Sequence, residues 1–177
     1  MTVRHAPVLA LCLAASLVLL AACGGGAGGT GTGETPVPGL QAFGATAAPL
    51  CQSALAPTLG CSAASAPGSP ATDWVDSVTG GQVRMHIEGN AVSLQDDCVH
   101  RHFDGVWGAA PGSDPLFFGT MLADGSTSRP PAALMVALDG QGGFQVRLIN
   151  LAGVAIGPPI TLRRSVAGDP PPTACPA

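Results

Sequence analysis

Residues 82–94 read QVRMHIEGNAVSL. Within residues 82–88 apolar and polar side chains alternate strictly, as they do in a strand with one buried face. The Gly89-Asn90 pair that follows is typical of a two-residue hairpin turn. A turn at this pair brings Ile87 opposite Val92 and leaves the large apolar residues of the stretch on one face. The stretch therefore predicts an antiparallel hairpin that lies with one face on a core.

Further short strands are expected C-terminal to this hairpin. They are separated by turns rich in glycine, proline and aspartate, and Pro130-Pro131 indicates a loop over residues 124–131. The predicted strands are residues 116–122, 132–138, 144–148 and 160–163. Short strands joined by tight turns, without an amphipathic helix, are typical of an all-β domain. We expect a small antiparallel meander that forms a barrel or sandwich of about six to eight short strands, preceded by a disordered tether.

The segment Gly105-Val106-Trp107 resembles the Gly-x-Trp that opens the first strand of lipocalin-like barrels. Only 70 residues follow Trp107, which is too few for an eight-stranded barrel that begins there. We therefore expect Trp107 to be a core or rim residue of the domain.

The N-terminus has the layout of a secretory signal peptide. Arg4 and His5 precede a nearly continuous apolar run over residues 6–22. The run is shorter than the roughly 20 apolar residues of a spanning helix, and glycines rather than a basic cluster follow it. Cleavage after the run is therefore expected.

The end of this run, Leu20-Ala21-Ala22-Cys23, resembles the lipobox of bacterial lipoproteins. The resemblance implies that Cys23 becomes the first residue of the mature chain and carries a diacylglycerol on its thiol. Two or three acyl chains anchor a protein stably to a bilayer. We expect a lipid-anchored, periplasm-facing protein of the bacterial cell envelope. Gly24, where an aspartate would favour inner-membrane retention, favours the outer membrane.

Composition divides the chain into segments. Residues 24–48 carry almost no large apolar side chain, so this part is expected to be a flexible tether. The predicted segments are a signal peptide (1–22), a Gly/Pro-rich tether (23–48), a low-complexity Cys-containing loop (49–72), an all-β domain (73–168) and a Pro-rich tail (169–177).

The cysteine count fits an exported protein. With Cys12 in the signal peptide and Cys23 lipidated, an even four remain, which predicts two disulfides with three alternative pairings. We favour a local Cys51–Cys61 bridge and a long Cys98–Cys175 bridge that holds the C-terminal tail. The residues after the signal peptide contain arginine but no lysine and are acidic overall, which argues against nucleic-acid binding.

The most polar stretch of the domain is a candidate metal site. If residues 96–104 are extended, His100 and His102 share one face, and His86 of the neighbouring hairpin could add a third nitrogen. The alternative is an exposed polar strand or loop. Cys98 offers no thiolate if it is oxidised, which favours that alternative.

No enzyme motif is found, so we expect neither catalytic residues nor a cofactor. The leading interpretation is a non-enzymatic envelope lipoprotein with a structural or binding role, whose partner is an envelope protein or a small ligand. One alternative is a small-ligand or metal-binding lipoprotein that uses a barrel mouth or the His100/His102 cluster. A further alternative is an inhibitor similar in size and disulfide use to the periplasmic lysozyme inhibitors, although their motif residues are missing.

Overall fold

The predicted hairpin is formed by strands β3 (Val83–Glu88) and β4 (Ala91–Asp96). Its register is the expected one, with Ile87 opposite Val92. Gly89 has a φ of 58°, whereas Asn90 is not in the left-handed region, as in a type II′ turn with glycine first. The computed structural model describes residues 37–61, 71–78, 81–169 and 175.

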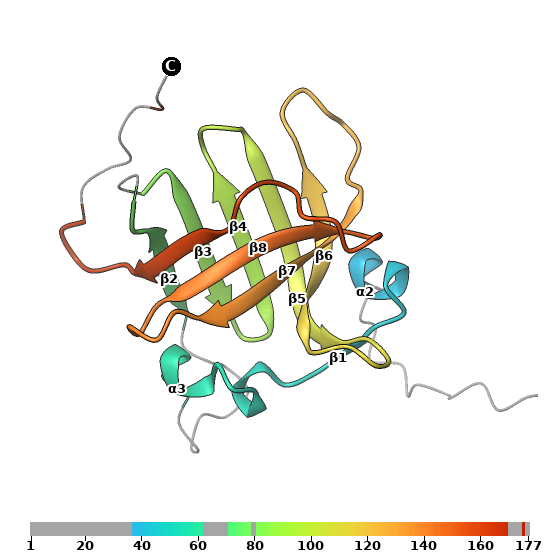
Figure 1. Cartoon of the computed structure of the whole chain (residues 1–177), viewed down its shortest axis with the longest axis horizontal. Helices are drawn as coiled ribbons and strands as arrows, with labels where there is room; N and C mark the ends of the chain where they lie inside the picture. Colours follow the sequence, from blue (N-terminus) through green and yellow to red (C-terminus); the bar gives the residue numbers. More distant parts are fainter. Residues whose placement is uncertain (1–36, 62–70, 79–80, 170–174, 176–177) are drawn as a thin grey trace, which may run out of the picture. The chain divides into compact units, whose positions relative to one another are not determined.

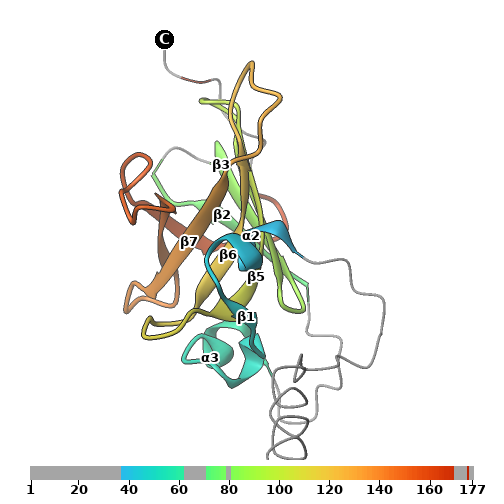
Figure 2. The same cartoon turned by 90° about the vertical axis from the view of Figure 1, so that its right-hand side faces the viewer.

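The hairpin belongs to a closed antiparallel barrel, which confirms the predicted all-β class. Each strand pairs with the next in the order β5-β4-β3-β2-β9-β8-β7-β6, and a β5–β6 pairing closes the ring of eight strands (Figures 1 and 2). A short additional strand, β1 (Thr46–Ala47), pairs with the end of β5. The other strands are β2 (Thr72–Asp76), β5 (Arg101–Ala109), β6 (Leu116–Leu122), β7 (Pro131–Leu138), β8 (Phe144–Asn150) and β9 (Ile160–Arg164).

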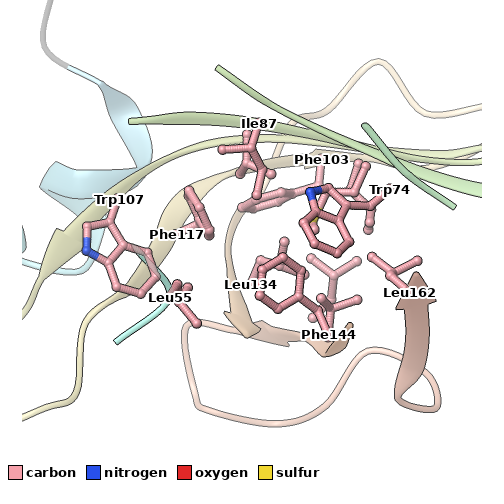
Figure 3. Packing of buried hydrophobic residues seen from close by; sticks show 14 of the residues in the cluster. Leu55, Trp74, Ile87, Phe103, Trp107, Phe117, Leu134, Phe144 and Leu162 are labelled. Atoms are coloured by element: carbon pink, nitrogen blue, oxygen red, sulfur yellow. The ribbon is translucent and has the colours of Figure 1, made fainter. Parts of the chain in front are cut away.

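Apolar side chains fill the inside of the barrel (Figure 3). The Trp74 and Phe144 rings lie 4.3 Å apart between centroids, and the Trp107 and Phe117 rings lie 5.0 Å apart. Phe103 is completely buried. Aromatic pairs at these separations pack as in protein cores, so the interior is occupied by the protein's own side chains.

One end of the barrel is covered by the segment around the first disulfide. A 3-10 helix, η1 (Leu50–Gln52), and a short helix, α3 (Ala56–Leu59), lie below the strands in Figure 1. The three leucines of this segment are buried in the barrel core: Leu50, Leu55 and Leu59. The described first part of the predicted Cys-containing loop, residues 49–61, is therefore part of the folded domain, because its large apolar residues complete the core.

The opposite end of the barrel is covered by the loop over residues 151–159. The Arg101 guanidinium donates a hydrogen bond to the Ile156 carbonyl at 2.7 Å and lies 3.7 Å from the Asp96 carboxylate. Ile156 in turn packs against the core. An inward arginine–aspartate pair thus holds the loop over this end.

The expected tether is wrong for residues 37–48. Helix α2 (Pro38–Ala42) lies on the outer face of β6 (Figure 2). There Gly39 meets the backbone of Gly119. The Phe43 ring packs on the Phe118 ring at 5.2 Å between centroids. A glycine at the contact lets the helix backbone reach the strand, and the aromatic pair adds apolar burial. The remaining tether residues, 23–36, and the signal peptide lie outside the described residues.

Two further expectations are corrected, and one is confirmed. Pro131 is not in a loop but begins β7, where its missing N–H is tolerated at the first strand position. Residues 97–100 form a turn, so residues 96–104 are not one extended strand. Trp107 is a core residue on β5, as expected. None of the described helices has the length and apolar character needed to cross a membrane.

Candidate functional site

A groove of about 450 Å³ lies on the outside of the barrel. It runs over the outer faces of β4 and β5, between the start of α2 on one side and the outward side chains of β3 on the other. Its lining residues are Val37, Pro38, Gly39, His86, Glu88, Ala91, Val92, Ser93, Asp104, Gly105, Val106, Gly119 and Thr120. We call this hollow the outer groove.

The outer groove exists because its floor carries short side chains. Ala91 and Ser93 face outward from β4, and Val106 faces outward from β5. Taller walls flank them, since α2 sits on β6 and the His86 and Glu88 side chains project from β3. The strand alternation that fills the interior thus leaves a shallow apolar trough with a polar rim on the outside.

One side of the rim is a histidine between two acids. His86 Nδ1 lies 2.7 Å from the Asp73 carboxylate, and His86 Nε2 lies 3.9 Å from the Glu88 carboxylate. Glu88 is 75% exposed. This side of the rim therefore carries acceptor oxygens that face solvent.

On β5, the Asp104 carboxylate adds acceptor oxygens to the lining of the outer groove. Asp104 contacts His102 Nε2 at 2.8 Å and receives a hydrogen bond from the Arg129 guanidinium at 3.1 Å. The described lining holds two carboxylates and one histidine but no arginine. Charge in the outer groove is therefore biased toward the negative.

The structure does not bring the three candidate metal ligands into one cluster. His86 pairs with Asp73 on the wall of the outer groove. His102 contacts Asp104, whereas His100 lies in the turn before β5 with a φ of 45°. His100 and His102 border a shared small hollow, but no three histidine, cysteine or acidic side chains in the described part of the chain are grouped to hold a metal ion.

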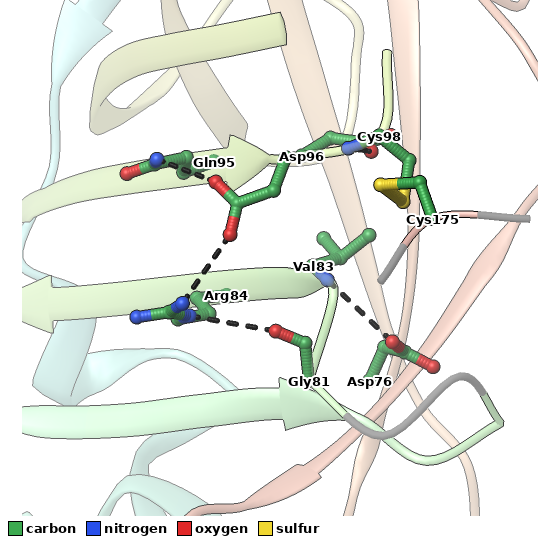
Figure 4. Close-up of polar contacts among 9 residues, drawn as sticks. Asp76, Gly81, Val83, Arg84, Gln95, Asp96, Cys98 and Cys175 are labelled. Carbon is green, nitrogen blue, oxygen red and sulfur yellow. Dashed lines mark hydrogen bonds and ion pairs between the residues drawn. A yellow bond between two sulfur atoms is a disulfide. The ribbon is translucent and has the colours of Figure 1, made fainter. Parts of the chain in front are cut away.

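Both predicted disulfides are present. Cys51 is bonded to Cys61, with a Cα–Cα distance of 5.6 Å. Cys98 is bonded to Cys175, with a Cα–Cα distance of 5.3 Å (Figure 4). The second bridge fastens residue 175 to the turn after β4. The predicted lipidation site, Cys23, lies outside the described residues.

A separate polar cluster fixes the chain after β9. The Arg163 guanidinium donates hydrogen bonds to both carboxylate oxygens of Asp169, at 3.0 and 2.7 Å. The Val166 N–H and the Ser165 hydroxyl also donate to Asp169. These bonds, led by the one from Arg163, hold the pKa of Asp169 well below its usual range. These contacts hold residues 165–169 against the end of β9, and we call them the Arg163–Asp169 latch.

The outer groove was missed at the sequence level because one wall comes from the predicted tether. A signal was present, since Val37, Leu40 and Phe43 recur every three residues and Pro38 suits a helix start. The small outward residues of β4 and β5 give no sequence signal of their own. They form the floor of a groove only because larger groups from neighbouring elements rise around them.

Comparisons of the chain with protein-family models, curated proteins and solved structures find no match. A function for the chain must therefore be argued from its own residues.

Proposed function

We propose that this chain is a non-enzymatic, lipid-anchored protein of the bacterial cell envelope that binds a partner on the outer surface of its barrel. The lipobox-like Leu20-Ala21-Ala22-Cys23 is the basis for the anchor. Acyl chains on Cys23 would hold the protein at a bilayer.

The observation that carries the proposal is the cysteine pairing. All four cysteines that follow Cys23 are bonded to one another, as an oxidising compartment favours. None of them is therefore left to pair with Cys23. A cysteine that directly follows a small-residue cleavage motif, and for which the four later cysteines are not available as partners, fits a lipid-modified residue.

The packing of the barrel supports binding on the outside rather than in the interior. Aromatic side chains occupy the interior, and chain segments lie across both ends. Ligand pockets are usually concave and mostly apolar with a few polar groups, a description that the outer groove fits.

Membrane fractionation tests the anchor. The full chain and a Cys23→Ser variant are expressed in a bacterial host, and a Cys12→Ser variant serves as a matched control for loss of a thiol near the N-terminus. We expect the unaltered chain and the Cys12 variant in the membrane fraction and the Cys23 variant outside it. Unchanged fractionation of the Cys23 variant would refute the proposal.

A further inference from the structure

We propose that the outer groove binds a small organic cation that has an apolar body and a primary ammonium group. This inference deepens the proposed function, because it rests on the chain being a binding protein and names the class of ligand. It depends on the described residues of the barrel and not on the anchor.

The shape of the outer groove fits the apolar body of such a ligand. The start of α2 supplies Val37 and Pro38 as one wall, and Ala91 and Val106 supply the floor. The volume of about 450 Å³ is within the range of small-molecule sites. An alkyl or aromatic group lying on this floor would be removed from water on the side that faces the floor and the α2 wall.

The strand register brings acceptor groups together at the rim. Ser93 on β4 lies directly opposite Asp104 on β5, and also opposite His86 on β3. Glu88 lies two residues along β3 from His86. Glu88 is therefore a diagonal neighbour of Ser93, at about 7–8 Å. A hydroxyl and two carboxylates therefore border one part of the outer groove.

Charge in the outer groove selects a cation. A primary ammonium carries three N–H donors and no acceptor, which matches a rim of carboxylate and hydroxyl oxygens. An anion would meet the Glu88 carboxylate, and the described lining contains no arginine to bind that anion. Arg129 and His102 already contact the Asp104 carboxylate. The Glu88 carboxylate is therefore the main negative charge available to the ligand.

Binding is measured by amide chemical-shift titration on the full, ¹⁵N-labelled chain with Cys23→Ser and both disulfides formed, at low ionic strength. The probe is n-hexylammonium. Hexyltrimethylammonium has the same charge without N–H donors, and hexanoate has the opposite charge. We expect saturable shifts at Ala91, Ser93 and Gly105 with hexylammonium, weaker binding of the trimethyl compound, and no saturable shift with hexanoate.

Two variants locate the site. Glu88→Gln is expected to raise the Kd for hexylammonium by about two- to fivefold, the range of an exposed ion pair. Ala91→Leu fills the floor without altering charge and is expected to abolish saturable binding. Asp114→Asn removes an exposed carboxylate on the turn before β6, outside the outer groove, and is expected to leave the Kd unchanged. Thermal unfolding of each variant verifies that the barrel is intact.

The inference is overturned if hexanoate binds as well as hexylammonium, if the shifts map away from the outer groove, or if Glu88→Gln and Asp114→Asn have the same effect. Its failure is distinguishable from failure of the anchor. Fractionation reports on Cys23 alone, and the titration uses a chain in which Cys23 is already replaced.

Discussion

Removing the two disulfides separately should destabilise the barrel by different amounts. One variant carries Cys98→Ala with Cys175→Ala, and the other carries Cys51→Ala with Cys61→Ala. Each pair replaces two sulfurs by hydrogens and leaves no free thiol from the broken bridge. The two variants are therefore matched controls for one another.

The lengths of the closed loops set the expected magnitudes. The bridges join residues 77 and 10 positions apart. In the chain-entropy model, closing such loops in the unfolded chain contributes about 4.5 and about 2.7 kcal/mol at 25 °C. The long bridge should thus contribute about 1.8 kcal/mol more to the free energy of unfolding.

Urea unfolding without reductant, followed by Trp fluorescence, measures both losses. A difference of about 1.8 kcal/mol corresponds to roughly 1 M urea between the two midpoints for a domain of this size. A loss in the Cys51–Cys61 variant that equals or exceeds the loss in the other variant would refute the loop-closure reasoning. It would mean that the short bridge acts mainly by holding Leu50, Leu55 and Leu59 in the core.

Three further changes test separate parts of the fold. Phe103→Ala should cost about 3–5 kcal/mol in urea unfolding because the ring is fully buried, and a loss below about 1 kcal/mol would contradict a filled interior. Phe43→Ala should speed hydrogen exchange in α2 while leaving the barrel protected, since it removes the contact with Phe118; unchanged exchange in α2 would contradict that docking. Asp169 has a folded pKa below its unfolded value of about 3.9, so its bond to Arg163 stabilises above about pH 5 and is lost as the pH falls. The stability difference between the unaltered chain and Asp169→Asn should therefore be smaller at about pH 2.5 than at pH 7, and an equal difference would argue against the latch.

The hairpin was predictable because its determinants are local. Alternation over residues 82–88 sets the buried face, and Gly89-Asn90 sets the turn, so the register follows without knowledge of the other strands. The favoured disulfide pairing is also confirmed, although the four cysteines alone allow three pairings. The hairpin shows that local alternation and turn chemistry fix this part of the fold.

The outer groove was not predictable from the sequence, because one of its walls is held in place by tertiary contacts. Helix α2 has five residues in a segment of tether-like composition, and it is held by tertiary contacts such as Gly39 on Gly119. A helix this short is unstable in isolation, so its sequence signal is weak. The extended interpretation of residues 96–104 failed similarly, because the tight turn at 97–100 uses a left-handed His100 rather than a glycine.

The most direct test of the central claim is the mass of the N-terminal peptide of the protein purified from bacterial membranes. We predict that the mature chain begins at Cys23 and that this residue carries diacylglycerol. Proteolysis followed by mass spectrometry reads the first residue and its modification together. A mature chain that begins elsewhere, or an unmodified Cys23 at its N-terminus, would contradict the account.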